Sequence, residues 1–476
     1  MLKHIGVKAA GKVKETVLIG LLRATLAKNK LDQKVKQALK GAGKPDSARR
    51  LPIKTSHDMK ILMGRYYIKA KVAANDPDKM IAWITSGGPV EILHAAGVTP
   101  IYPENHAAMM GTTRLADAAC EVAEGRGYSR DVCSYARSDL GQVWGSKSPI
   151  GGLPKPDFLV CCNNICGTVT KWYQQLQRIY NVPLIMIDAP YQYGDDRPEA
   201  IDYVKAQLQD MMEQVGRITG KQIQWDAFEA TVRRSEEATK LWRDVQGLLA
   251  HRPAPMNSFD TFIHLAPIVT LRGTPECIEY YKKLYAEIEQ RVRDGVASVP
   301  GEQYRLGWDN LAIWYKIRFL AQKFGQHHAA LVVSTYAESF CYQPAYRDDK
   351  DILRSLAATY IAGYINHSID YRERELLEMV EKFHLNGFVM HSNRSCRAYS
   401  LGQYELAKRI EEKHGIPTIM IEADQSDTRS WSDEQVATRI DAFMEVLASR
   451  AKRHSRAAVV LGREACATGA SNSRPN

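Results

Sequence analysis

One segment of the chain occurs twice, and this duplication limits the possible folds more than any other feature. The first copy runs from Pro156 to Asp188 and the second from Asn386 to Glu422. Each copy has a buried-strand run, an Asn three residues before a Cys, a helical stretch, and a second apolar strand that ends in an acid. The aligned cysteines, Cys166 and Cys396, are 230 residues apart, which is the size of a domain. We therefore expect an α/β protein with two duplicated Rossmann-like or flavodoxin-like domains, each built on a parallel sheet.

The period of the hydrophobic residues divides the chain into successive regions. Strand-like and helix-like runs alternate after Ser56, as in a parallel sheet with crossover helices, and long amphipathic stretches replace them between Trp225 and Val296. A strand-like run returns at Ala330. The predicted regions are a basic helical arm and linker (1–55), a first α/β domain (56–196), a mainly helical region (197–329), a second α/β domain (330–450) and a disordered tail (451–476).

The formal net charge of +10 at pH 7 belongs to the N-terminal arm. Residues 1–50 contain 13 Lys or Arg and three acids, so the rest of the chain is neutral overall. A nucleic-acid partner is therefore not expected. The segment from Glu15 to Leu39 has the apolar stripe of a helix. We expect this arm to dock on a partner or to extend into solvent, and contact with a membrane or a targeting role is a less favoured alternative.

Composition also indicates the compartment. Nine cysteines are an odd number, and they lack the dense spacing of a secreted disulfide scaffold. The sequence has no run of 18 uncharged apolar residues, and Lys residues interrupt its start before any apolar run. We therefore expect a cytoplasmic protein with free thiols.

Three cysteines stand on separate loops, and two of them occupy equivalent positions of the duplicated unit. Cys133 lies in DVCSYARSDLG, Cys166 in CCNNIC and Cys396 in NRSC. Three thiolates could converge on one iron–sulfur cluster and leave one iron open to substrate. The simpler alternative is that they are buried small hydrophobic residues. The other cysteines are expected to pack at a strand end (Cys161 and Cys162) or have no motif around them (Cys120, Cys277, Cys341 and Cys466).

A hydroxyl group and a carboxyl group follow two neighbouring strands of the first predicted sheet. Ser86 lies in TSGGPVEIL and Glu104 in YPENHAAM. Such a pair can bind a carbonyl oxygen and move a proton. The alternative is that Ser86 caps the helix near Pro89 and that Glu104 is a surface turn residue. Neither segment matches a phosphate-binding loop, so nothing suggests that this chain binds a nucleotide itself.

Histidines and aromatic residues give weaker signals. His106, His264 and His391 are candidate acid–base groups, although a single His is more often a structural residue. Trp308, Trp314 and Tyr315 could form the wall of an apolar pocket, with core packing as the simpler interpretation.

The chain resembles the 2-hydroxyacyl-CoA dehydratase and benzoyl-CoA reductase family. The resemblance runs from about Met63 to Leu447, and the basic arm and the C-terminal tail lie outside it. It is carried by the segments AWITSGGPVEIL, YPENHA, DVCSYAR, PDFLVCCNNICGTVTKWY, VPLIMIDAPY, PAPMNSFDTFIHLAPIVTLRG, NRSCRAYS and EADQSDTR.

This resemblance implies a catalytic component with two related subunits, each of which holds a [4Fe-4S] cluster by three cysteines. On this chain the ligands would be Cys133, Cys166 and Cys396. Ser86 and Glu104 match the Ser and Glu that lie beside the thioester of an acyl-CoA substrate. Electrons would come from a separate iron–sulfur activator that hydrolyses ATP, in agreement with the missing phosphate loop in this chain.

The activity has three candidate forms. The segments around Cys166 and His264 are closer to the benzoyl-CoA reductase branch, which implies one-electron reduction of an aromatic acyl-CoA to a cyclic diene. The alternative is a 2-hydroxyacyl-CoA dehydratase, which eliminates water to an enoyl-CoA by the same ketyl chemistry. The third is a non-catalytic subunit that holds a cluster and relays electrons.

Overall fold

Two four-stranded sheets form the frame of the molecule, and all their strand pairs are parallel. The computed structural model describes residues 15–17, 19–20, 52–195, 197–342 and 347–469. The first sheet contains β1 (Ile81–Ile84), β2 (Thr99–Ile101), β3 (Phe158–Cys162) and β4 (Leu184–Ile187). The second contains β5 (Tyr304–Asp309), β6 (Ala329–Ser334), β7 (Gly387–Asn393) and β8 (Thr418–Ala423).

The two sheets have the same topology, which confirms the predicted duplication. The strand order is β2-β1-β3-β4 in the first sheet and β6-β5-β7-β8 in the second. β3 and β7 hold equivalent places, and each leads through a Cys-containing loop into a helix. Every residue of β1, β3 and β6 is buried, as expected for parallel strands that are covered on both faces.

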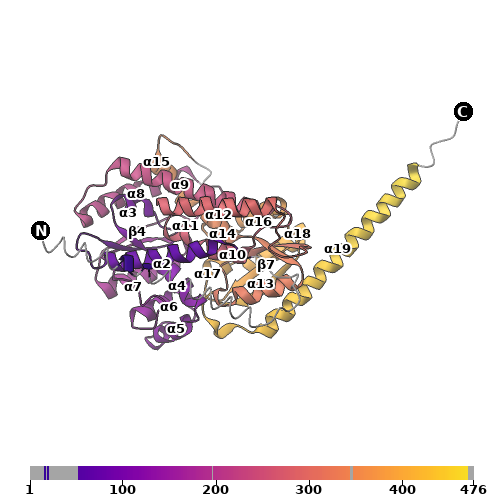
Figure 1. Ribbon diagram of the computed structural model, residues 1–476, viewed down its shortest axis with the longest axis horizontal. Helices are drawn as coiled ribbons and strands as arrows, with labels where there is room; N and C mark the ends of the chain where they lie inside the picture. Colours follow the sequence, from indigo (N-terminus) through magenta and orange to yellow (C-terminus); the bar gives the residue numbers. More distant parts are fainter. Residues whose placement is uncertain (1–14, 18, 21–51, 196, 343–346, 470–476) are drawn as a thin grey trace.

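Helices surround both sheets and connect them. The first unit contains α2 (Thr55–Ala73), α3 (Val90–Ala95), α4 (Pro103–Thr112), α5 (Ala116–Gly125), α6 (Ser134–Val143) and α7 (Gly167–Tyr180). The connecting region contains α8 (Pro198–Thr219), α9 (Trp225–Gly247), α10 (Ser258–His264), α11 (Ala266–Thr270) and α12 (Pro275–Arg293). The second unit contains η3 (Trp314–Lys316), α13 (Ile317–Gln326), α14 (Thr335–Glu338), α15 (Ile352–Ile361), α16 (Ile369–Phe383), α17 (Arg397–Ser400), α18 (Gln403–His414) and α19 (Asp433–Gly469). α9 contacts α3 of the first unit and η4 (Ser339–Cys341), which follows β6 and α14 of the second, so it links the two units. α15 packs on α8 and lies beside the first sheet in Figure 1.

The region 197–329 departs from the mainly helical prediction because it contains β5, which pairs with both β6 and β7. The sequence did not predict this strand because two residues interrupt its apolar pattern. Arg305 is fully buried and donates hydrogen bonds to three main-chain carbonyl groups and to Glu302. Gly307 lies under the ring of Phe388, and a Cβ atom there would come within 2.3 Å of a ring carbon. The second sheet therefore begins before Ala330.

The ends of the chain differ from the prediction or lie outside the structure. The tail predicted to be disordered from residue 451 instead continues α19 as far as Gly469. This stretch is rich in Ala and Arg, which have high helix propensity, and Figure 1 shows the helix extending away from both units. The predicted arm helix, from Glu15 to Leu39, lies largely outside the described residues.

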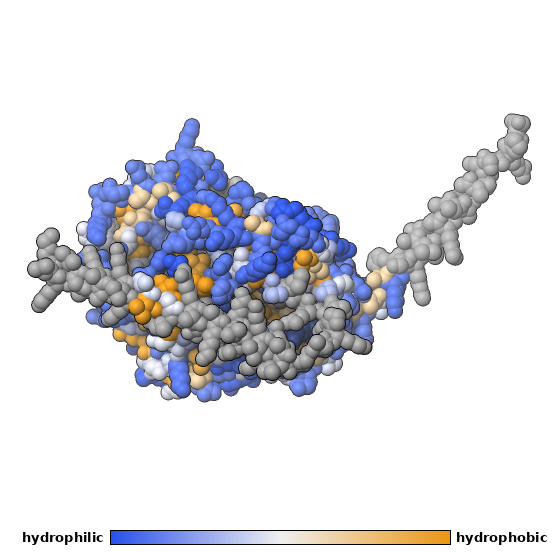
Figure 2. Space-filling view, viewed as in Figure 1, coloured by the Kyte–Doolittle hydropathy of each residue, from blue (hydrophilic) through white to orange (hydrophobic). Residues whose placement is uncertain are grey.

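The described surface is mostly hydrophilic in the view of Figure 2. Hydrophobic residues gather in that view around the positions of α2 and α7, whereas the face over α12 and α16 is hydrophilic. Within the described residues, no helix is both long enough and apolar enough to cross a membrane.

Candidate active site

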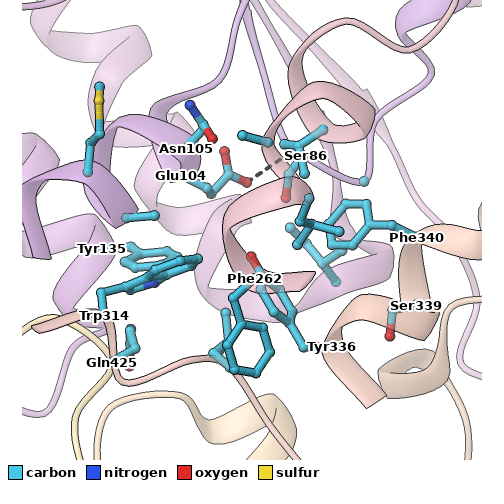
Figure 3. A pocket seen from close by; sticks show the side chains of 18 of the residues that line it. Ser86, Glu104, Asn105, Tyr135, Phe262, Trp314, Tyr336, Ser339, Phe340 and Gln425 are labelled. Atoms are coloured by element: carbon cyan, nitrogen blue, oxygen red, sulfur yellow. Dashed lines mark hydrogen bonds between the residues drawn. The ribbon is translucent and has the colours of Figure 1, made fainter. Parts of the chain in front are cut away.

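A cavity of about 790 Å³ is lined by residues of both α/β units. Its walls are mainly apolar, and Figure 3 shows Ser86 and Glu104 beside a group of aromatic side chains. Four of its lining residues are exposed, and they define what we call the rim: Lys60, Thr112, Ile263 and Arg318. The charged residues among the described residues that line the cavity are Lys60, Glu104 and Arg318. Glu104 is therefore the one charged group in this lining that lies away from the rim.

Strand ends bring Ser86 and Glu104 together. Ser86 follows β1, and Glu104 lies in the first turn of α4, which follows the neighbouring strand β2. The main-chain N–H of Ser86 donates a 3.1 Å hydrogen bond to Oε1 of Glu104. The turn after Ser86 needs Gly87, because a Cβ atom there would lie 2.6 Å from Ile165 and 2.7 Å from Asn164.

The carboxyl group of Glu104 is suited to proton transfer near neutral pH. Its side chain is buried, and burial raises its pKa to about 7, although the N–H and hydroxyl groups of Ser86 act in the opposite direction. The alternative interpretations of both residues are wrong. Glu104 is not a surface residue, and α3 has Pro89 at its N-cap without a side-chain cap.

Cys133, Cys166 and Cys396 all reach this cavity. Each occupies the N-cap position of a helix: Cys133 for α6, Cys166 for α7 and Cys396 for α17. All three are partly exposed and line the cavity. The remaining cysteines whose side chains are described are buried: Cys120, Cys161, Cys162, Cys277 and Cys341. Cys466 lies in the part of α19 whose side chains are not described.

The surroundings of the three thiols combine burial with hydrogen-bond donors. Burial raises the pKa of Cys133 to about 12 and also raises the pKa of Cys166 and of Cys396. Main-chain N–H groups at the start of each following helix act against this rise. Nε2 of Gln425, a fully buried residue, donates a further hydrogen bond of 3.3 Å to Sγ of Cys133.

The three thiols line one cavity, although the described residues contain no preformed metal site. No group of three or more His, Cys, Asp or Glu side chains among the described residues is arranged to hold one metal ion. Cys133, Cys166 and Cys396 nevertheless line the same cavity, and neighbouring thiols contribute to the raised pKa of Cys133 and of Cys396. Within the described lining, no fourth cysteine joins them. A cluster held here would keep one iron directed at the cavity.

The candidate histidines lie outside the cavity lining. His106 and His391 are fully buried, and burial lowers the pKa of each to about 4. Nε2 of His106 is 2.8 Å from Oγ of Ser148, and Nδ1 of His391 is 2.7 Å from a main-chain carbonyl oxygen. His264 is also buried and is hydrogen-bonded to Tyr280. All three are therefore hydrogen-bonded core residues rather than acid–base groups of this site.

Aromatic residues form much of the wall, and the sequence identified only part of them. Trp314 and Tyr315 line the cavity, whereas Trp308 is fully buried in the core outside it. The wall also contains aromatic residues that the sequence did not single out: Tyr135, Phe262, Tyr336, Phe340, Tyr364 and Tyr399. A signal was present for Tyr135, two residues after Cys133, and for Phe262 in SFDTFIHLAP.

A buried ion pair fixes one side of the site. Arg272 and Glu91 are both buried, with Nε of Arg272 3.3 Å from Oε1 of Glu91. The guanidinium group also donates to the hydroxyl of Tyr342, which lines the cavity, at 2.8 Å, and to that of Tyr360 at 2.7 Å. This fully bonded group therefore holds the connecting region against α3 and α15.

Comparisons with known proteins identify the family of this chain. A model of the family described as 2-hydroxyglutaryl-CoA dehydratase, D-component, matches residues 85–447. The (R)-phenyllactyl-CoA dehydratase alpha subunit of Clostridium sporogenes is 34% identical over 381 residues, which cover 79% of this chain and 92% of the relative. The (R)-2-hydroxyisocaproyl-CoA dehydratase alpha subunit of Clostridioides difficile is 34% identical over 398 residues, covering 82% and 95%. A benzoyl-CoA reductase subunit of Thauera aromatica is 28% identical over 385 residues, covering 78% and 89%.

The family model begins directly after β1 and ends within α19, and it includes each of the five predicted site residues that line the cavity. On these grounds the chain belongs to the 2-hydroxyglutaryl-CoA dehydratase D-component family, which includes relatives that act on 2-hydroxyacyl-CoA and on benzoyl-CoA.

Proposed function

We propose that this chain is the catalytic subunit of a 2-hydroxyacyl-CoA dehydratase that removes water from an apolar 2-hydroxyacyl-CoA to give the enoyl-CoA. The observation that carries this proposal is the pair formed by Ser86 and the buried carboxyl group of Glu104 inside an apolar cavity. A subunit that only relayed electrons would need no such pair.

The relatives support dehydration over aromatic reduction. Both dehydratase alpha subunits are 34% identical to this chain, compared with 28% for the benzoyl-CoA reductase relative. The segments that favoured the reductase in the sequence therefore do not outweigh the similarity to the dehydratases over nearly the whole family region.

Ser86 and Glu104 have separate tasks in this proposal. The hydroxyl of Ser86 donates a hydrogen bond to the thioester oxygen while negative charge develops on it. Glu104 takes the proton that leaves C3 after the 2-hydroxyl group has departed. A pKa near 7 lets this carboxyl group both accept and release a proton at neutral pH. The aromatic wall keeps water from the radical form of the substrate.

Cys133, Cys166 and Cys396 are the residues that would hold a [4Fe-4S] cluster. Their partial exposure to one cavity and their positions at the N-terminal ends of three helices support this assignment. The chemistry that the cluster supplies when bound is reversible one-electron transfer to the thioester carbonyl. A second, related iron–sulfur subunit and an ATP-hydrolysing activator complete the proposed system, in keeping with relatives that are named as subunits.

The charges of the cavity support a substrate with an uncharged acyl chain. Lys60 and Arg318 are exposed at the rim, so no Lys or Arg of the described lining lies inside to pair with a second carboxylate. Burial of an unpaired carboxylate is unfavourable by several kcal/mol. The proposed substrates are therefore aromatic or branched 2-hydroxyacyl thioesters rather than 2-hydroxyglutaryl-CoA.

Benzoyl-CoA reduction is the second candidate, because a cavity walled by Tyr135, Phe262 and Trp314 also accommodates a flat ring. An anaerobic assay on the complex copurified with its partner subunit, supplied with activator, ATP and reductant, separates the two. Enoyl-CoA formed from phenyllactyl-CoA or 2-hydroxyisocaproyl-CoA, without turnover of benzoyl-CoA, supports the dehydratase. Formation of a cyclic diene from benzoyl-CoA would instead show that the complex is a benzoyl-CoA reductase.

Alanine at Ser86 tests whether the pair is catalytic. We expect Ser86→Ala to keep its iron and to lose most of its turnover. Full activity in this variant and in Glu104→Gln would favour the relay subunit instead.

A further inference from the structure

The rim of the cavity carries two cations that have no partner in the described part of the chain. Lys60 projects from α2 and Arg318 from the first turn of α13. Both are exposed, and neither forms a hydrogen bond or an ion pair with another described residue. Exposed cations of this molecule otherwise often pair with acids, as Lys282 does with Glu237 at 2.7 Å. Two unpaired cations at the opening of an apolar cavity are therefore placed to meet an anion from solvent.

The distance from the rim to the Ser86–Glu104 pair is set by two helices. Nδ2 of Asn105, next to Glu104, donates a 2.7 Å hydrogen bond to the hydroxyl of Tyr67, so Tyr67 of α2 lies beside the end of α4 that carries Glu104. Lys60 lies seven residues before Tyr67 on α2, which is about 10 Å along the helix axis. Thr112 at the rim lies eight residues after Glu104 on α4, which is about 12 Å.

One face of α2 lines the path between these two ends. Lys60, Met63, Gly64 and Tyr67 all line the cavity, and their spacing places them on a single helix face. The path is apolar between its ends, with one cation at its opening on α2 and another on α13. A ligand that matches it has a phosphorylated end, a long neutral arm and a reacting group that reaches Glu104.

We propose that Lys60 and Arg318 bind the phosphate groups of the coenzyme A moiety and thereby position the thioester beside Ser86 and Glu104. This inference rests on the proposed function, because it takes the substrate to be an acyl-CoA. Arg offers a planar fork of N–H donors to phosphate oxygens, and Lys offers a compact charge. The pantetheine arm then occupies the apolar path along α2, and the acyl group lies among the aromatic residues inside.

Binding measurements on the copurified complex test this assignment without turnover. Calorimetric titration with coenzyme A, 3′-dephospho-coenzyme A and pantetheine compares ligands that differ in phosphate groups. We expect Lys60→Gln and Arg318→Gln each to weaken coenzyme A binding about fivefold at low salt, as for an exposed charge pair. Pantetheine binding should stay unchanged in both variants.

Two exposed cations outside the cavity provide matched controls. Lys79→Gln and Arg126→Gln remove the same charges, and neither residue lines the cavity. Both controls should bind coenzyme A as the parent complex does. If the controls lose as much coenzyme A affinity as the rim variants do, the effect comes from the net charge of the protein, and the assignment is wrong.

The outcomes separate this inference from the proposed function. If the parent complex binds coenzyme A and both rim variants bind it equally well, the rim assignment is wrong and the dehydratase proposal stands. A rim variant that loses pantetheine affinity as strongly as coenzyme A affinity also overturns the assignment, because the phosphates would then not be the groups recognised. If the parent complex binds neither coenzyme A nor any acyl-CoA, the proposed function itself is wrong.

Discussion

The main-chain N–H of Ser134 donates a 3.0 Å hydrogen bond to Oγ of Ser395, although the two residues are 261 positions apart in the chain. Ser134 directly follows Cys133, and Ser395 directly precedes Cys396. Ser395 in turn donates to the carboxylate of Asp424, and all of these groups except Cys133 and Cys396 are buried. The two cysteine loops, one from each α/β unit, are therefore tied together by one hydroxyl group.

This hydroxyl group should control how well the cysteines hold iron. We expect Ser395→Ala to destabilise the junction by about 1–3 kcal/mol, because it leaves the N–H of Ser134 and the carboxylate of Asp424 without this partner. Iron and acid-labile sulfide per chain should fall, and thermal unfolding should shift to lower temperature. Ser430→Ala, at an exposed position, is the control and should change neither quantity. Undiminished iron and unchanged melting in Ser395→Ala would show that the junction does not depend on this hydrogen bond.

Gln425 should tune the electron affinity of the cluster. Its amide donates to Sγ of Cys133, and hydrogen bonds to cluster sulfurs are among the factors that set the reduction potential. We expect Gln425→Leu to shift the midpoint potential to more negative values, because a donor that stabilises negative charge on sulfur is lost. An EPR-monitored redox titration measures this shift. A potential equal to that of the parent, at equal iron content, would rule out this role.

Cysteine variants test the ligand set directly. Cys396→Ala should lose the cluster and its broad visible absorption, because one of three thiolate ligands is missing. Cys277→Ala should keep both, since Cys277 is fully buried and its Sγ contacts the carbonyl of Pro267 at 3.4 Å. Full iron content in Cys396→Ala would contradict the assignment.

The sequence was most informative where a hydrophobic run is continuous. The alternation of helix-like and strand-like runs predicted after Ser56 corresponds to α2, β1, α3 and β2, and the buried-strand runs of the two copies correspond to β3 and β7. β5 was missed because its buried Arg305 and its Gly307 break the apolar pattern. The reasons for both residues lie in distant segments, namely carbonyl groups near residue 250 and the ring of Phe388.

The residues of the candidate site also divide into those that the sequence identified and those that it did not. Strand ends and the duplicated cysteine position made Ser86, Glu104 and the three cysteines candidates, the family resemblance implied their roles, and the structure brings all five to one cavity. The rim and Gln425 were not foreseen, because they join the cavity only through packing of segments that are far apart in sequence. The presence of a histidine did not predict an acid–base group. The role of His106, for example, is decided by its burial beside Ser148, which the sequence does not reveal.

Close packing of α5 on α6 should position Cys133. A Cβ atom on Gly141 of α6 would lie 1.9 Å from the carbonyl oxygen of Ala119 on α5. We expect Gly141→Ala to push the helices apart, with a loss of about 1–3 kcal/mol of unfolding free energy and a lower iron content. Gly125→Ala, at the end of α5 with no atom within 4 Å of its Cβ position, should leave both unchanged. Chemical denaturation and iron analysis make the comparison, and equal stability of the two variants would refute tight packing at Gly141.

The raised pKa of Glu104 should lower the free energy of unfolding at neutral pH. Its pKa rises from an ordinary value of 4.5 to about 7 on folding. As the pH rises from 4.5 to 7, the unfolded chain releases this proton while the folded chain retains it, so stability falls across this range and stays low above it. Glu104→Gln should therefore be more stable than the parent at pH 8, by on the order of 2–3 kcal/mol, and the gain should nearly disappear at pH 5.

Asp139→Asn is the matched control, because it should show the same pH-dependent gain in stability without a loss of turnover. Burial also raises the pKa of Asp139 to about 7, but its carboxylate accepts from Trp172 and does not line the cavity. Melting temperatures at pH 5 and pH 8 should show the same pH-dependent gain in both variants, whereas turnover should be lost only in Glu104→Gln. In the parent, turnover should fall as the pH drops below about 7, because protonated Glu104 cannot accept the C3 proton. Turnover in Glu104→Gln would mean that this carboxyl group is not the proton acceptor. A stability gain that is the same at pH 5 and pH 8 would mean that it is not a buried acid with a raised pKa.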